Sequence, residues 1–383
     1  MKVTKRYLSI VLLFVLTLLF VGCDKPVDTP VVETTVTEVN VVEYQDTVYL
    51  GEVYDESSVK VEVKFSDNTT KMYSGEDLLI GYNEFDAYTE GEYKLMVRII
   101  PINKVEEITV TVSRKTIKIL MIANSFGDDT VQWVHEIGED LGYDFTIANL
   151  YIGGCTLETH LSNLNSAARA YEYVTYKKST KTWNRIPNTS IQMAMEKEDW
   201  DYISLQQGSW ASGLADTYDT INTIMDGIIA LKSDVKFLWN MTWAYQTDSN
   251  HSSFHIYGSN QMTMYNQIVN AVKTKVVPND RFVAIIPNGT AVQNARTSFV
   301  GDTLCRDIYC HLTLDFGRYI AGLTLVSIVT GEDISSVKYS PNLSNILYEP
   351  SSKMHQLLLS CAMFSIPLLI IFISFSFGQL MNA

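Results

Sequence analysis

The chain has 383 residues, with 43 Asp and Glu against 29 Lys and Arg, and therefore a formal net charge of −14. This acidic balance argues against nucleic acid or an anionic lipid surface as a partner, because both bind basic patches. The five cysteines do not form a disulfide framework at this length, and Cys305 and Cys310 are expected as free buried thiols rather than as a pair. With only six histidines in the chain, we predict no structural zinc site.

The N-terminus has the pattern of a secretory signal peptide, predicted over residues 1–22. Basic residues precede the apolar run 8–21, and a small residue stands just before Cys23. Cys23 at the cut resembles the lipid-modified cysteine of bacterial lipoproteins, although Phe20 stands where leucine is usual. Several acyl chains would anchor such a protein at a membrane surface, and an uncleaved anchor helix is the alternative. Either outcome places the rest of the chain outside the cytoplasm, at a bacterial cell surface.

An all-β domain is predicted over residues 37–114, after a polar tether at 23–36. Apolar and polar residues alternate over 59–65, 93–99 and 108–112, with polar turns between these runs. Short alternating strands at regular spacing predict an antiparallel sandwich. The segment resembles the bacterial Ig-like domains of surface proteins, which implies a spacer or adhesive role.

The C-terminal segment 357–377 is almost entirely apolar and is long enough to cross a bilayer. It follows a linker at 336–356, and positive charge flanks it only on the side of Lys353. A cytoplasmic tail without positive charge runs against the usual bias of membrane proteins. A second membrane anchor is therefore one interpretation, and an atypical C-terminus is the other.

The main domain is predicted over residues 115–335, where apolar runs alternate with helical patterns. The predicted strands cover 117–122, 145–150, 201–205, 235–241 and 281–286. This alternation predicts an α/β fold with a doubly wound parallel sheet in a three-layer, flavodoxin-like arrangement. A helix is expected to begin near Asp128. The stretch 171–186, rich in Tyr, Lys and Trp, is expected as an insertion over one end of the sheet.

The most informative position is Ser125, which follows the first buried strand at the point where a helical pattern starts. In open α/β sheets, ligands and chemistry collect at the carboxyl ends of the strands. A serine there is a candidate nucleophile, and its own N–H lies at the start of a helix. The alternative is that Asn124 or Ser125 only caps the helix, because both residue types are good N-caps.

Three further groups of residues follow later strands. The glycines at 153–154 let the backbone N–H groups approach a ligand. Gln206 and Gln207 carry amide donors, and Asp307 and His311 precede the last helical pattern. Each group alone has a structural explanation, such as a turn, a solvated loop or a helix cap. Their arrival at one edge of the predicted sheet favours a common site.

These strand-end residues resemble the sequence blocks of the SGNH (GDSL-like) hydrolases. Residues 122–126 are similar to the first block, Gly154 to the second, and the pair of Asp307 and His311 to the last. Further similarity, to an uncharacterised branch of that superfamily, lies in 205–209 and 317–319, and the resemblance extends from residue 118 to 332. It implies an SGNH-hydrolase-like fold and the hydrolysis of esters.

The sequence departs from the pattern of that superfamily in three ways. Ala123 stands where glycine is usual, and the asparagine of the third block is missing. The spacing from Asp307 to His311 is one residue longer than in the family block. On a helical turn both spacings keep the two residues on one face, so the pair can still meet.

The resemblance implies acyl transfer to water. Ser125 would be the nucleophile, His311 the general base, and Asp307 the residue that orients the imidazole, with Asp302 as the fallback. No metal or organic cofactor is implied.

A second set of residues is implied in binding the substrate and its oxyanion. The N–H groups of Ser125 and Gly154 and the side-chain amide of Gln207 would hold the oxyanion, with Gln206 as a weaker candidate for the amide. Asn124 is placed in the same set. Each donor of this kind is typically worth about 3 kcal/mol of the barrier.

These observations predict an extracellular serine esterase that removes acetyl or similar acyl groups, from carbohydrates or small esters. The aromatic residues Trp183, Trp210, Trp243 and Tyr245 either rim the site, where they would stack on sugar rings, or belong to the core. One alternative is a catalytically inert, glycan-binding or adhesive surface lipoprotein. The other is a lipase-like esterase that acts near the membrane.

Overall fold

The computed structural model describes residues 34–307, 310–341, 360 and 362. The predicted signal peptide, Cys23, and most of the linker and of the apolar segment 357–377 lie outside the described residues. In the part of the chain that the structure describes, no helix is both long and apolar enough to cross a membrane. The chain divides into two compact units. One holds the described residues up to 45 with 55–83 and 94–108, and the other holds 46–54, 84–93 and the chain from 109 onward.

Two small all-β sheets are built from the strands before residue 114. These strands are β1 (Val36–Glu43), β2 (Thr47–Tyr49), β3 (Lys60–Phe65), β4 (Thr70–Ser74), β5 (Leu78–Gly81), β6 (Gly91–Ile99) and β7 (Lys104–Ser113). One sheet has the order β1–β3–β4 and the other the order β2–β7–β6–β5. The expected alternation is present in β3, where Val61 and Val63 are fully buried between partly exposed charged residues. The grouping of these sheets into an Ig-like sandwich over 37–114 stays a prediction.

The other strands form one seven-stranded sheet in the order β11–β10–β9–β8–β12–β13–β14. They are β8 (Lys115–Ala123), β9 (Tyr143–Tyr151), β10 (Tyr171–Lys177), β11 (Thr182–Thr189), β12 (Tyr202–Leu205), β13 (Lys236–Asn240) and β14 (Phe282–Ile286). From β9 to β14 all neighbours pair in parallel. Their order is the doubly wound, flavodoxin-like one, in which the direction of winding reverses between β8 and β12.

The stretch 171–186, expected as an insertion over the sheet, instead forms the hairpin β10–β11 and extends the sheet at its edge. β10 pairs antiparallel with β9, with Val174 opposite Asn149, and β11 pairs antiparallel with β10. The middle of β11 is exposed, so this edge strand carries no buried face that would mark it in the sequence. The prediction was therefore wrong, and the sheet is mixed rather than wholly parallel.

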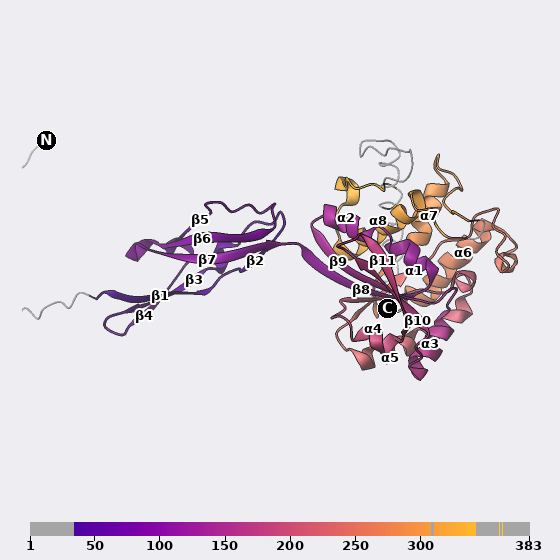
Figure 1. The fold of residues 1–383 in the computed structure, drawn as a ribbon, viewed down its shortest axis with the longest axis horizontal. Coiled ribbons are helices and arrows are strands. Elements are labelled where there is room, and N and C mark those ends of the chain that lie inside the picture. The colour runs from indigo at the N-terminus through magenta and orange to yellow at the C-terminus, as the bar shows by residue number, and fades with distance from the viewer. Residues whose placement is uncertain (1–33, 308–309, 342–359, 361, 363–383) are drawn as a thin grey trace, which may run out of the picture. The chain divides into compact units, whose positions relative to one another are not determined.

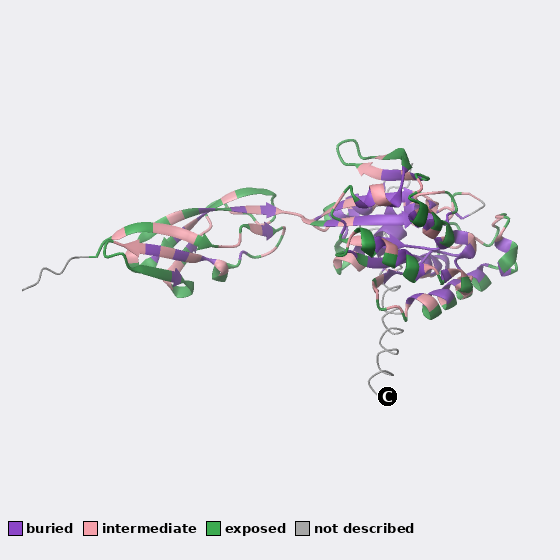
Figure 2. Ribbon diagram, turned by 90° about the horizontal axis from the view of Figure 1, so that it is seen from below, coloured by how far each residue is buried: buried purple, intermediate pink, exposed green. Residues whose placement is uncertain are grey.

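Helices cover both faces of this sheet, as Figure 1 shows. They are α1 (Ser125–Val131), α2 (Val134–Asp140), α3 (Leu157–Ser166), α4 (Ile191–Met195), α5 (Ile221–Leu231), α6 (Gln261–Ala271), α7 (Asn288–Arg296) and α8 (Phe316–Thr330). On one face α1, α2 and α7 pack against α8, and on the other α3 packs against α4 and α5. Residues 119–123 of β8 are fully buried between the two helical layers, in the purple interior of Figure 2.

The first helix begins at Ser125 rather than near Asp128. Asn124 is its N-cap, because its side-chain oxygen accepts a hydrogen bond from the N–H of Phe126 at 2.9 Å. The cap has extended backbone and directly follows β8, so the strand passes into the helix without an intervening loop. Asn124 thus does the capping, which leaves the hydroxyl of Ser125 for other partners.

Candidate active site

Ser125 lies at the point where the winding of the sheet reverses. β8 and β12 are neighbours, with Ile122 opposite Leu205, so the residues that follow these strands emerge next to each other. Crevices outside the carboxyl ends of strands at such a switch point are the usual ligand sites of open α/β sheets. The fold therefore puts Ser125 and Gln206 at the edge where chemistry is expected.

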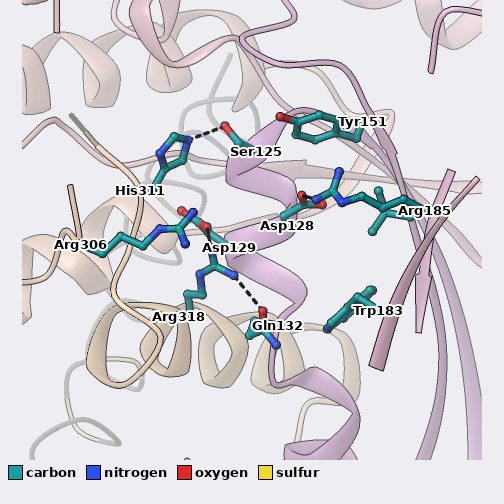
Figure 3. Close-up of a pocket in the computed structure, with 11 residues that line it drawn as sticks. Ser125, Asp128, Asp129, Gln132, Tyr151, Trp183, Arg185, Arg306, His311 and Arg318 are labelled. Carbon is teal, nitrogen blue, oxygen red and sulfur yellow. Dashed lines mark hydrogen bonds and ion pairs between the residues drawn. The ribbon is translucent and has the colours of Figure 1, made fainter. Parts of the chain in front are cut away.

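The structure brings Ser125, His311 and Asp307 together. The Nε2 atom of His311 lies 2.9 Å from the Oγ of Ser125, as Figure 3 shows, and its Nδ1 lies 2.7 Å from the Oδ2 of Asp307. A nucleophile and its base are expected within about 2.6–3.2 Å, with a third group orienting the base. With the proton on Nδ1, the ring donates to Asp307 and accepts from the serine hydroxyl, which is the arrangement that a general base requires.

The loop that carries His311 accommodates the longer spacing to Asp307. The Oδ1 of Asp307 accepts hydrogen bonds from the N–H groups of Cys310 at 3.0 Å and His311 at 3.3 Å. The N–H of Arg306 donates to the carbonyl of His311 at 2.8 Å and closes the loop. Burial raises the pKa of Asp307, but the hydrogen bonds from His311 and from the Cys310 N–H outweigh it, so the pKa is lowered and the carboxyl stays ionised.

A buried aromatic pair connects the serine and histidine segments. Phe126, the neighbour of Ser125, stacks on Trp243 with ring centroids 4.2 Å apart, and it meets the His311 ring edge to face. The Nε1–H of Trp243 donates to the carbonyl of Cys310 at 2.8 Å. The start of α1 and the histidine loop therefore pack on the same side chains, and close packing holds their relative position.

The aromatic residues expected near the site fall into two groups. Trp243 and Tyr245 are fully buried and belong to the core. Trp210 lines a separate cavity beside Thr217, whereas Trp183 lines the cavity next to Ser125. Of these four aromatics, only Trp183 can face a substrate bound at the serine.

Five carboxamide side chains form a buried row across the carboxyl ends of the parallel strands, here called the amide row. In sheet order its members are Asn149, Asn124, Gln206, Asn240 and Asn288, and each is at most 1% exposed. Asn149 donates to the backbone carbonyl of Asn124 at 3.0 Å. Along the rest of the row, three amide-to-amide hydrogen bonds of 2.8 Å run from Asn288 through Asn240 and Gln206 to the Oδ1 of Asn124.

Asn124 also connects the amide row to the loop that carries Gly154. The Nδ2 of Asn124 donates to the carbonyl of Cys155 at 3.1 Å, which fixes this loop relative to β8 and β12. Hydrogen-bonded networks in a low-dielectric interior make a core rigid, and here only the Oδ1 atoms of Asn149 and Asn288, at the two ends of the row, have no hydrogen-bond partner among the described residues. Asn124 and Gln206, expected to bind the substrate or its oxyanion, are fully buried and point into this row instead. They position the site without reaching its surface.

Gln207 does not reach the serine either. Its Nε2 donates to the carbonyl and the hydroxyl of Thr217, both at 2.9 Å, and its Oε1 accepts from the N–H of Leu157 at 3.0 Å. The expectation of an oxyanion donor at Gln207 was therefore wrong. Consecutive side chains at the end of a strand point to opposite sides, so Gln206 and Gln207 cannot both face Ser125.

Two backbone donors remain for an oxyanion, the N–H groups of Ser125 and Gly154. Neither has an acceptor within the residues that the structure describes. Gly154 is exposed and has a φ of +63°, which glycine adopts without strain and which other residues rarely do. This conformation accounts for a glycine at the position implied by the second sequence block.

Asp302, the fallback for Asp307, has other partners. Its Oδ1 lies 2.8 Å from the Nε of Arg296, and its Oδ2 accepts from the N–H of Thr247 at 2.7 Å. These contacts join two loops and leave the orientation of the imidazole to Asp307.

A second nucleophile next to the site is excluded by burial. The Sγ of Cys155 lies 3.5 Å from the Nδ1 of His160. Burial raises the pKa of Cys155 to about 12 and lowers that of His160 to about 3, so no thiolate–imidazolium pair forms. Cys155, Cys305 and Cys310 are free thiols. No three His, Cys, Asp or Glu side chains of the described segments gather in a way that could hold a metal ion.

A cavity of about 320 Å³ opens beside Ser125 and His311 (Figure 3). Its charged lining residues are Asp128, Asp129, Arg185, Arg306 and Arg318. None of them was expected at the site from the sequence, in which Asp128 marked only the expected start of a helix. The sequence carried a signal for Arg318, because this residue lies in the 317–319 block that resembles the SGNH hydrolases. No sequence signal marked Arg185, because its place at the cavity depends on the pairing of β11 at the sheet edge.

The fold and the site together define a doubly wound α/β protein with a hydrogen-bonded serine, histidine and aspartate at the switch point of its sheet. The chain belongs to the DUF4886 family, because the model of that family, a domain of unknown function, matches residues 118–353. The crystal structure of a DUF4886 family protein from Bacteroides uniformis is 38% identical, with a TM-score of 0.59. That match covers 66% of this chain and 95% of the other.

Other solved structures match at low identity. A candidate SGNH hydrolase from Slackia heliotrinireducens is 16% identical over 56% of this chain and 100% of its own, with a TM-score of 0.35. A carbohydrate esterase of family 3 from Talaromyces cellulolyticus is 11% identical over 55% of this chain and 94% of its own, with a TM-score of 0.34. No curated protein matches the chain.

Proposed function

We propose that this protein is a serine esterase that hydrolyses acyl esters, most simply acetyl esters of carbohydrates. The observation that carries the proposal is the pair of hydrogen bonds at His311, 2.9 Å to the Oγ of Ser125 and 2.7 Å to the carboxylate of Asp307. Helix capping does not require this pair, because Asn124 already caps the helix.

The proposed reaction proceeds in two stages. The Oγ of Ser125 attacks the ester carbonyl while the Nε2 of His311 takes its proton, and Asp307 stabilises the resulting imidazolium. The N–H groups of Ser125 and Gly154 stabilise the oxyanion, and the imidazolium then protonates the departing alcohol. Water, activated by the same nitrogen, hydrolyses the acyl-serine and releases the acid.

The proposal places the enzyme outside the cytoplasm of a bacterium. In it, Cys23 carries the lipid anchor, residues 37–114 form an Ig-like spacer, and 357–377 is a possible second anchor. The inert, glycan-binding alternative drew its support from the longer spacing between Asp307 and His311. The two hydrogen bonds of the His311 imidazole form despite this longer spacing, which supports the active enzyme over the inert alternative. The lipase-like alternative differs from the main proposal only in the acyl chain.

The test compares the full chain, in mild detergent, with its Ser125→Ala variant on p-nitrophenyl acetate, p-nitrophenyl decanoate and an O-acetylated oligosaccharide. We expect turnover by the wild type and a loss of at least about 10³-fold in the variant, with an unchanged circular dichroism spectrum. Equal rates in the two proteins would refute the assignment of the nucleophile. A strong preference for the decanoate ester would select the lipase-like alternative.

A further inference from the structure

The three arginines that line the cavity beside Ser125 differ in whether they form ion pairs. Arg185 forms ion pairs with Asp128 and, at 2.7 Å, with Glu172. Arg318 forms a buried ion pair with Asp129 at 2.6 Å. Arg306 is exposed, and its guanidinium has no ion-pair or hydrogen-bond partner among the described residues. Of the three arginines that line the cavity, Arg306 is therefore the one whose charge is left for a ligand.

The position of Arg306 makes this charge relevant to a bound ester. Figure 3 shows its side chain directed toward Asp129, across the cavity from Arg185, with Ser125 and His311 at the same cavity. Its backbone N–H is bound to the carbonyl of His311 at 2.8 Å, so the residue is fixed to the loop that carries the base. A group that binds Arg306 is thus held at a defined place relative to the scissile bond.

Arg318 does not compete for such a group. Its Nη2 contacts Asp129, its Nη1 donates to the side chain of Gln132 at 2.8 Å, and its Nε donates to the carbonyl of Leu312 at 3.3 Å. Asp129 also accepts from the N–H of Leu312 at 2.8 Å. Both side chains of the buried pair are therefore already bound to neighbouring residues, and neither is left to bind a ligand.

We infer that Arg306 is a specificity-determining residue that selects esters carrying a carboxylate near the scissile bond. A guanidinium binds a carboxylate through two parallel hydrogen bonds, which gives both affinity and orientation. A singly charged group fits better than a phosphate dianion, because Arg306 offers one unpaired positive charge at the cavity, whereas Arg185 and Arg318 are already paired with Asp128 and Asp129. The carboxylate can belong to the acyl group or to the alcohol, such as an acidic sugar.

This inference rests on the proposed esterase function, and the experiment separates the two. Full-length wild type, Arg306→Gln and Arg306→Lys are assayed on a neutral ester, p-nitrophenyl acetate. Two charged probes follow, mono-p-nitrophenyl succinate for an acidic acyl group and O-acetyl galacturonate, with O-acetyl galactose as its neutral match. The matched control is Arg169→Gln, which removes one charge from an exposed arginine outside the cavity.

We expect Arg306→Gln to lower kcat/KM at least about 10-fold for one or both acidic probes and to change it less than about 2-fold for the neutral ones. Arg306→Lys should recover part of the loss, and Arg169→Gln should match the wild type. The acidic probe that responds identifies whether the carboxylate sits on the acyl group or the alcohol. Equal losses on acidic and neutral esters, or no loss on either acidic probe, would overturn the inference.

A binding measurement covers the case in which no probe is turned over, which would refute the esterase proposal itself. Calorimetric titration of Ser125→Ala with galacturonate and galactose, with and without Arg306→Gln, reports the anion site without chemistry. Selective binding of galacturonate that depends on Arg306 and weakens with added salt supports the site. Equal affinity for the two sugars rejects it.

Discussion

The Oδ2 of Asp307 lies 2.7 Å from the Nδ1 of His311, across a spacing that is one residue longer than the one implied by the sequence blocks. The other carboxylate oxygen accepts the N–H groups of Cys310 and of His311 itself. The aspartate therefore builds the loop that carries the histidine as well as orienting its ring. Any change at Asp307 acts on the imidazole through both contacts.

Asp307→Asn is expected to lower kcat on p-nitrophenyl acetate by about 10³–10⁴-fold, because an amide at this position favours the wrong imidazole tautomer. The measurement is steady-state hydrolysis by the full chain. Asp302→Asn is the control, since its contacts to Arg296 and Thr247 leave His311 untouched, and it should keep kcat within about 3-fold. A larger loss for Asp302→Asn than for Asp307→Asn would show that the orienting residue has been assigned incorrectly.

The two neighbouring glutamines are expected to respond differently to replacement by leucine. Both are buried and hydrogen-bonded, so each variant should lose about 1–3 kcal/mol of unfolding free energy. Gln206→Leu removes the link between Asn240 and Asn124, and misplacement of the serine turn should lower kcat at least about tenfold. Gln207→Leu breaks contacts with Thr217, with the start of α3 and with the N–H of Gly208, all away from Ser125, and its kcat should stay close to that of the wild type.

Denaturant unfolding gives the stability of both glutamine variants, and p-nitrophenyl acetate hydrolysis below the unfolding range gives kcat. Similar kcat values for the two variants would mean that the amide row has no special part in positioning Ser125.

Acid is expected to destabilise the fold through two buried histidines. Burial lowers the pKa of His135 and of His160 to about 3, from an ordinary value of 6.5. Below pH 6.5 the unfolded chain binds protons that the folded chain does not, so stability is complete above this pH and falls as the pH drops toward 3. The slope approaches about 1.4 kcal/mol per pH unit for each histidine.

The pH dependence is measured as unfolding free energy between pH 7 and 4. His160→Gln should reduce the slope, because it removes one of the two histidines whose pKa burial lowers. A wild-type stability that stays constant over this range would contradict the prediction.

Replacement of Trp183 is expected to affect mainly substrate binding, whereas replacement of Trp243 is expected to affect mainly stability. Trp183→Ala should raise KM for an O-acetylated oligosaccharide and cost less stability than Trp243→Ala, because its half-buried ring lines the cavity beside Ser125 and packs on one side against His135 and Tyr176. Trp243→Ala removes the stack on Phe126 and the hydrogen bond to Cys310, and should cost about 3–5 kcal/mol of stability. Thermal unfolding and steady-state kinetics on both variants test this division, and a KM unaffected by Trp183→Ala would remove it from the binding site.

Local patterns in the sequence were enough to predict the five parallel strands, because a strand buried on both faces is an apolar run of limited length. The same patterns placed Ser125, Gly154 and Gln206 at one edge of the sheet, since residues that follow parallel strands must emerge on the same side. Within the hairpin β10–β11, the edge strand β11 escaped prediction because an exposed edge strand lacks a buried face.

Side-chain direction was decided only by the tertiary structure. Neighbouring glutamines look alike in sequence, yet packing turns Gln206 into the amide row and Gln207 toward Thr217. The contact between His311 and Ser125 joins residues 186 positions apart, and the free charge of Arg306 exists only because its neighbours are paired elsewhere. The sequence by itself determined which residue types reach the sheet edge, whereas dense packing of distant segments decided which of their atoms face the cavity.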